Sequence, residues 1–258
     1  MRLLRFTGFS LLEYLRSGRV AIEIIAALSV YAIFFRRTME SAYFFSVCGV
    51  FTPIITLYTM AAFISLGDRP QGYVLLSRGV GRAVYLLGLF LGAVVIVAGT
   101  YGLICLMVAL TNRPTDLDVL TNRPTDLSLG SWFLGTLPTL LNIGLLAALM
   151  LMLSPLVFPT SWRLAVLGMI ALAFSSNFIG GQVLETLSSP GRALLGALQA
   201  LLGGPLVPAF YGFQLAVTRD YSTPTAIANL LAQASLLVSL LGLSVYAFAR
   251  RDLIFASQ

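Results

Sequence analysis

The sequence contains no lysine and no histidine, and each absence excludes a class of chemistry. Without lysine there is no Gly-Lys-Ser/Thr phosphate loop, so the chain cannot act by itself as a P-loop ATPase. Without histidine there are no His-based metal sites, Ser-His-Asp triads or histidine proton relays. The two cysteines, Cys48 and Cys105, fall in apolar runs, which favours buried thiols over a disulfide framework. We therefore expect no enzymatic activity, cofactor or metal in this chain.

Charged residues are also scarce, at 10% of the chain against 58% hydrophobic residues, and the mean hydropathy is +0.92. A water-soluble domain of 258 residues could not cover its surface with so little polar area. A helix needs about 20 mostly apolar residues to cross the ~30 Å hydrocarbon layer. The sequence therefore predicts an all-α, polytopic membrane protein, with a single transmembrane domain over 1–258. Its six predicted transmembrane helices are 20–35, 42–66, 83–110, 131–157, 164–183 and 226–249.

The sixteen arginines predict the orientation of these helices. With the amino terminus in the cytoplasm, ten arginines lie inside, whereas six lie outside together with six acidic residues. The excess of inner positive charge favours cytoplasmic termini, although Arg36 and Arg37 fall outside and oppose it. Because these arginines lie where topology signals and anionic headgroups place them, the net charge of +6 indicates membrane lipids and not nucleic acid as a partner.

The amino-terminal segment 1–18 alternates leucine and phenylalanine with arginine at helical spacing. This pattern predicts an amphipathic helix on the inner membrane surface, ended by Ser17 and Gly18. A simple basic leader is the alternative. We expect no cleavable signal peptide, because Glu13 interrupts the apolar stretch and no small-residue cleavage site follows.

Two predicted outer segments have unusual sequences. The loop 111–130 contains TNRPTDL twice at a period of ten residues, which indicates a tandem duplication in a tolerant loop; a weak cation site at Asp116 and Asp126 is the alternative. In the region 184–224, the apolar run 193–202 is too short to span and predicts an interfacial or re-entrant helix before the last span. A seventh span there would move Arg250 and Arg251 outside, against the charge rule.

Few polar residues fall within the predicted spans. Glu23 is the only acidic one, and an ionisable group at membrane depth is a functional candidate, although we favour pairing with Arg19 one turn earlier. Four amide side chains also fall within these spans. They either line a pathway or form hydrogen bonds between helices, and the second use is commoner. These amide residues are Asn142, Asn177, Asn229 and Gln233.

The predicted inner loop 67–82 carries the most specific pattern in the chain. Its residues Asp68, Gly72, Leu75-Leu76-Ser77, Val80 and Arg82 precede Tyr85-Leu86-Leu87-Gly88. This pattern resembles the loop after the second span of ABC-2 type transporter permeases, where an acidic residue and a glycine precede Leu-Leu-Ser, Pro-Val-Ser-Arg and Tyr-Leu-Leu-Gly. The chain departs from the family pattern at Gly79, Gly81 and Leu89, where proline, serine and lysine are common.

The resemblance implies that this loop forms a coupling helix seated on a separate ATP-binding subunit. Leu75 and Leu76 would be its apolar anchors, and a solvated loop that only sets topology is the alternative. The family further implies two ATP-binding subunits holding ATP and Mg, a second permease, identical or related, and export across a bacterial or archaeal plasma membrane. The other residues assigned to coupling are Asp68, Arg69, Gly72, Arg78 and Arg82.

Two other functions remain open from the sequence. A secondary transporter or channel would need no ATPase, but ion coupling usually requires relay groups and only Glu23 is present within the spans. A non-transporting membrane subunit would use the same loop to hold an ATPase. The sequence does not identify the substrate.

Overall fold

The computed structural model describes residues 2–36, 40–68, 80–111, 129–175, 190–191, 193, 196–197 and 207–250. Every regular element within these residues is helical, which confirms the predicted all-α class. The helices are α1 (Arg2–Arg16), α2 (Val20–Phe34), α3 (Ser41–Gly67), α5 (Arg82–Thr111), α7 (Leu129–Met152), α8 (Thr160–Ser175), α11 (Val207–Thr218) and α12 (Pro224–Arg250).

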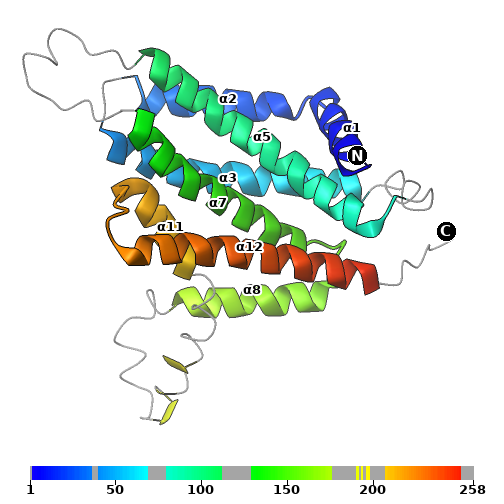
Figure 1. The fold of residues 1–258 in the computed structure, drawn as a ribbon. Coiled ribbons are helices and arrows are strands. Elements are labelled where there is room, and N and C mark those ends of the chain that lie inside the picture. Colours follow the sequence, from blue (N-terminus) through cyan, green and yellow to red (C-terminus); the bar gives the residue numbers. More distant parts are fainter. Residues whose placement is uncertain are drawn as a thin grey trace, which may run out of the picture.

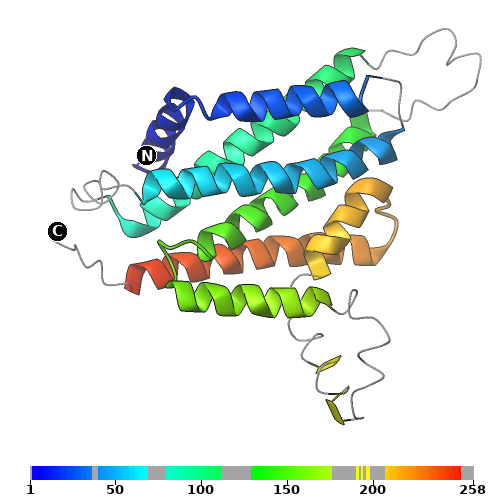
Figure 2. The same cartoon turned by 180° about the vertical axis from the view of Figure 1, so that it is seen from behind.

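The long helices α3, α5, α7 and α12 run lengthwise through the molecule, with α2 on one side and α8 on the other (Figures 1 and 2). One end of the bundle carries α1, the start of α5 and the last turn of α12, and we call it the α1 end. The opposite end carries the turn between α11 and α12, and we call it the α11 end. Arginine is concentrated at the α1 end, where helices begin or finish near Arg16, Arg19, Arg82, Arg163 and Arg250.

Four helices are long and apolar enough to cross a membrane: α3, α5, the Trp132–Met152 part of α7, and α12. Helices α1 and α2 pass the same test as a pair bent by 74°, which raises the number to five. Helix α8 has 16 residues, and the remainder of the predicted span 164–183 lies outside the described residues. The composition and length of these helices indicate membrane insertion, but the described chain matches four or five of the six predicted spans.

The bend between α1 and α2 has a local cause in the backbone. Gly18 adopts φ +73°, the left-handed conformation that ends helices and that residues with a Cβ atom rarely adopt. The predicted amino-terminal helix and its break at Ser17 and Gly18 are therefore confirmed. Helix α1 packs along α5, buries Phe6 and Tyr14, and exposes Leu4 and leucines further along.

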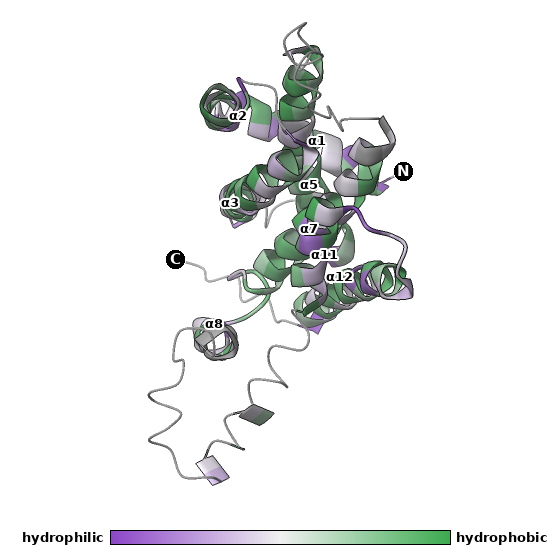
Figure 3. Cartoon of the chain, turned by 90° about the vertical axis from the view of Figure 1, so that its left-hand side faces the viewer, coloured by the Kyte–Doolittle hydropathy of each residue, from purple (hydrophilic) through white to green (hydrophobic). Residues whose placement is uncertain are grey.

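Two clusters of buried side chains form the core. The cluster at the α1 end joins α1, α3, α5, α7 and α12 and includes Tyr14, Phe63 and Tyr85. The other lies toward the α11 end and includes Phe44 and Tyr101. The long helices are mostly hydrophobic in composition (Figure 3), and many of their large apolar side chains are exposed, as expected where lipid replaces water as the solvent.

Helix α11 is a 12-residue helix that packs against α3, α7 and α12. It falls within the region predicted to be re-entrant, although most of the run 193–202 lies outside the described residues. Both α3 and α7 contain an internal proline, Pro53 and Pro138, which removes one helical hydrogen bond from each. Phe213 of α11 lies against Gly49, four residues before Pro53, where an added Cβ would come 2.1 Å from its ring.

Helix α8 packs only weakly against the rest of the described structure. It follows α7 through a turn and runs back from the α1 end at the edge of the bundle (Figures 1 and 3). Its side chains Leu164 and Leu167 are 65% and 49% exposed. An apolar helix with so little protein contact requires an apolar environment, which a bilayer supplies.

Candidate functional site

The described residues at both ends of the predicted coupling loop are fixed to the bundle. Asp68 is the C-cap of α3, and its backbone N–H donates to the carbonyl of Ile64 at 2.9 Å. One residue earlier, the carbonyl of Gly67 accepts a 2.5 Å hydrogen bond from the hydroxyl of buried Tyr85 in α5. An added Cβ at Gly67 would lie 2.7 Å from Leu89, so glycine permits this close approach of α3 and α5.

Arg82 connects the other end of the loop to α12. Its Nη1 donates to the carbonyl oxygens of Ala249 at 2.8 Å and Phe248 at 3.3 Å. These carbonyls belong to the last turn of α12, which lacks helical donors and carries the negative end of the helix dipole. Arg82 thus has a contact within the bundle, and its predicted contact with an ATP-binding subunit stays a prediction.

The remaining predicted coupling residues lie outside the described part of the chain. They are Arg69, Gly72, Leu75, Leu76 and Arg78. The structure therefore describes the three helices that hold the ends of the loop, α3, α5 and α12.

Glu23 is buried where α1, α2 and α3 meet. Its Oε1 accepts hydrogen bonds from the hydroxyl of Tyr14, at 2.6 Å, and from the hydroxyl of Thr59. Its Oε2 is buried and has no partner among the described residues. The favoured pairing with Arg19 is not found there; Arg19 instead donates to the carbonyl of Ala62 at 3.1 Å. Glu23 thus joins three helices through hydroxyl groups.

A second polar contact lies between α7, α11 and α12. Gln233 is fully buried, and its Nε2 donates to the Oδ1 of Asn142 at 2.8 Å, so these two predicted pathway residues lie together. Gly212 of α11 covers the same amide, because an added Cβ there would lie 1.7 Å from that nitrogen. The Oε1 of Gln233 has no partner among the described residues. The contact is of the kind that joins helices in membranes.

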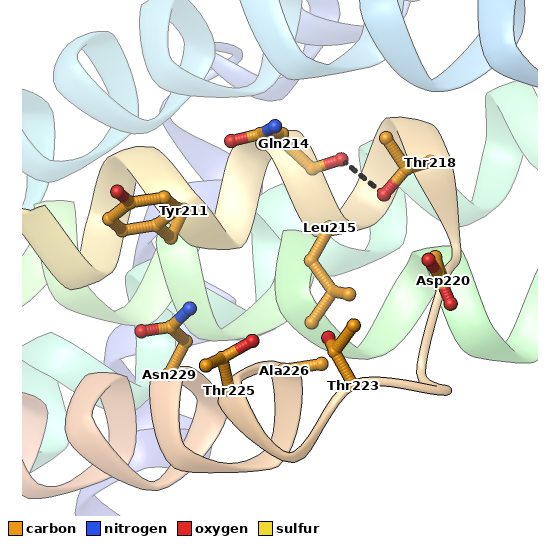
Figure 4. Close-up of a pocket in the computed structure, with 9 residues that line it drawn as sticks. All are labelled: Tyr211, Gln214, Leu215, Thr218, Asp220, Thr223, Thr225, Ala226 and Asn229. Atoms are coloured by element: carbon orange, nitrogen blue, oxygen red, sulfur yellow. Dashed lines mark hydrogen bonds between the residues drawn. The ribbon is translucent and has the colours of Figure 1, made fainter.

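Asn229, one turn before Gln233 on α12, lines an open crevice of about 470 Å³ between α11, α12 and their connecting turn (Figure 4). Leu215 and Ala226 form its apolar part, and the other lining side chains are polar. Figure 4 shows Tyr211 of α11 and Asn229 of α12 on facing sides. The remaining polar lining residues are Gln214, Thr218, Asp220, Thr223 and Thr225.

The turn beside this crevice is held by two local interactions. Asp220 accepts hydrogen bonds from the hydroxyl of Ser222 at 2.6 Å and from its backbone N–H at 2.9 Å, which lower the pKa of the exposed carboxyl. The hydroxyl of Tyr221 donates to the carbonyl of Leu134 in α7 at 2.5 Å, and burial raises its pKa. The turn that borders the crevice is therefore attached to α7 as well as to α11 and α12.

Three of the five predicted pathway residues, Asn142, Asn229 and Gln233, gather around α7, α11 and α12. Glu23 lies elsewhere, on α2, and Asn177 lies outside the described residues. Sequence reasoning assigned no role to Tyr14 or Tyr221, because a tyrosine hydroxyl gives no sequence signal of its acceptor. Comparison of the chain with protein-family models, curated proteins and solved structures finds no match.

Proposed function

We propose that this chain is the membrane-spanning permease subunit of an ATP-binding cassette transporter. The proposal rests on one observation: hydrogen bonds fix both ends of the loop whose sequence resembles an ABC-2 coupling segment. Tyr85 joins α5 to the end of α3, and Arg82 joins α5 to the end of α12. A force on residues 69–79 would therefore be transmitted to α3, α5 and α12 together.

In this proposal two permease chains, identical or related, form the pathway, and two separate ATP-binding subunits supply ATP, Mg and hydrolysis. ATP binding closes the nucleotide-binding pair, the loop carrying Leu75 and Leu76 moves with it, and α3, α5 and α12 follow as a unit. The α1 end is cytoplasmic, with both termini, and α1 lies along the inner surface of a bacterial or archaeal plasma membrane. Transport is outward.

The polar groups toward the α11 end fit the outer part of such a pathway. The Asn142–Gln233 contact and the crevice lined by Asn229 place amides and hydroxyls along α7, α11 and α12. Helix α11, at 12 residues, would be re-entrant from the outer side. The attachment of Glu23 to Tyr14 and Thr59 supports a structural role for this acid, which weakens the case for an ion-coupled transporter.

The test is purification of the chain in mild detergent from its host, with mass spectrometry and an ATPase assay on the recovered proteins. We expect a stoichiometric ATP-binding subunit. The double variant Leu75→Asp/Leu76→Asp should lose this subunit and substrate-stimulated hydrolysis while still inserting in the membrane. The control Leu117→Asp, in the predicted outer loop, should retain both. A particle without an ATPase, or unchanged coupling in the double variant, would refute the proposal.

A further inference from the structure

An apolar cavity of about 260 Å³ lies at the edge of the bundle, toward the α1 end. Its walls come from Met152 at the end of α7, Phe158 in the following turn, Val166 of α8 and Leu243 of α12. The helix α8 that closes one side packs only weakly on the others, so the cavity borders the apolar outer surface. In a bilayer such a space is in contact with lipid chains, because no water is available there to fill it.

Arg163 borders this cavity through its carbon atoms only, so the lining is apolar throughout and the guanidinium lies outside the space. Its Nη2 donates to the hydroxyl of Thr160 at 2.7 Å, and its buried Nε has no partner among the described residues. No carboxylate among the described residues pairs with Arg163. A guanidinium at the edge of an apolar cavity, with its outer nitrogens exposed, is placed to bind an anion at the level of the lipid headgroups. Within the described part of the chain, Nη1 and the second hydrogen of Nη2 have no acceptor, and the planar group matches the geometry of a phosphate.

Trp162, beside Arg163 in the first turn of α8, also lines the cavity and is 61% exposed. Tryptophan favours the level of the lipid headgroups, where its ring meets apolar chains and its N–H meets polar groups. The charged group and the ring thus lie at the start of α8, whereas Val166 and Leu243 line the space beside them. This order, polar at the helix end and apolar beyond it, matches the order of headgroup and acyl chain in a phospholipid.

We propose that the cavity between α7, α8 and α12 holds an acyl chain of an anionic phospholipid, against Val166 and Leu243, while the phosphate lies outside the cavity on the guanidinium of Arg163. The site requires membrane insertion but does not depend on the transporter function proposed above. The bound lipid would fill the gap beside α8 and fasten this weakly packed helix to α7 and α12.

The experiment is native mass spectrometry of the full chain released from vesicles containing equal amounts of phosphatidylglycerol and phosphatidylcholine. The wild-type chain should retain phosphatidylglycerol in preference to phosphatidylcholine. Arg163→Gln should reduce that preference on the order of tenfold, since it removes the charge-assisted hydrogen bonds. Arg250→Gln is the matched control, because this arginine at the same end stacks on Tyr246 at 4.7 Å, away from the cavity lining, and should leave the preference unchanged.

A second pair of variants tests the acyl chain. Val166→Trp fills the cavity and should lower retention of both lipids, whereas Leu164→Trp, on the exposed side of α8, should not. A photoactivatable acyl chain should cross-link the wild-type protein to peptides of α7, α8 and α12, which keeps the test valid if a variant fails to fold. The proposal would be overturned if the wild type and Arg163→Gln retained phosphatidylglycerol equally, or if the cross-links fell outside α7, α8 and α12. It would also be overturned if millimolar inorganic phosphate alone displaced the bound lipid as well as phosphatidylglycerol does.

Discussion

The hydroxyl of Tyr221, in the turn between α11 and α12, donates a 2.5 Å hydrogen bond to the carbonyl oxygen of Leu134 in α7. That carbonyl lies four residues before Pro138, which has no N–H to offer it. The tyrosine therefore takes the place of the helical donor that proline removes from α7. In doing so it attaches the turn between α11 and α12 to α7, and with it one side of the crevice.

Replacement of Tyr221 by phenylalanine should destabilise the chain by about 1 kcal/mol, the usual net value of one hydrogen bond. The effect should shrink in a Pro138→Ala background, because alanine restores an N–H donor for Leu134. Thermal unfolding of the four proteins in one detergent measures the coupling. Equal effects of Tyr221→Phe in both backgrounds would show that the hydroxyl does not substitute for the missing donor.

Alanine at Gly88 should destabilise the chain by about 1–3 kcal/mol, because the new Cβ would lie 2.2 Å from the ring of Phe6. The clash would push α1 away from α5. The matched control on the same helix is Gly99→Ala, whose Cβ meets nothing within 4 Å. It should be neutral or stabilising by roughly 0.5–1 kcal/mol, the helical advantage of alanine. Similar losses of thermal stability in both variants would contradict the assigned packing of α1.

Glu23→Ala should cost about 1–3 kcal/mol or more, because it leaves the buried hydroxyls of Tyr14 and Thr59 without their acceptor. Glu23→Gln retains an acceptor oxygen and should cost less. Limited proteolysis near Ser17 and thermal unfolding should distinguish the two variants, with faster cleavage in the alanine variant. If the glutamine variant is stable yet loses transport, Glu23 acts in the pathway and the structural assignment is wrong.

Tyr85→Phe should cost about 1–3 kcal/mol, because the carbonyl of Gly67 becomes a buried acceptor without a donor. Tyr43→Phe, on the exposed surface of α3, is the control and should change little. In a complex with ATP-binding subunits, the Tyr85 variant should also weaken the link between hydrolysis and transport. Transport and hydrolysis would be measured together in proteoliposomes, and intact coupling despite lost stability would separate the two roles of this tyrosine.

The helices themselves were predictable because long apolar runs allow few alternatives. The predicted ranges 42–66, 83–110 and 226–249 fall within α3, α5 and α12 to within two residues at each end. The break after α1 was equally predictable, because glycine, present at position 18, is one of the few residue types that readily adopt a left-handed backbone. Shorter elements such as α11 were placed only by region, because composition alone does not separate an interfacial helix from a loop.

Side-chain partners were much less predictable. The nearest opposite charge in the sequence suggested that Glu23 pairs with Arg19, but the fold brings Tyr14 and Thr59 to it from α1 and α3. Arg82 has a carbonyl partner 167 positions away, which local spacing cannot reveal. Asn142 and Gln233 were both singled out as polar residues in apolar helices, but their contact depends on how α7 and α12 pack.

The internal prolines of α3 and α7 leave each helix one backbone hydrogen bond short, and such a position is where a helix bends most easily. Helix α11 contacts α3 near Pro53 through Phe213, and the turn that follows α11 contacts α7 near Pro138 through Tyr221. A swing at Pro138 would therefore pull on the wall of the crevice, while the Tyr85–Gly67 contact, which joins α3 to α5 at the opposite end, would be left undisturbed. A bend at Pro138 would thus alter the α11 end while α3, α5 and α12 stay joined at the α1 end.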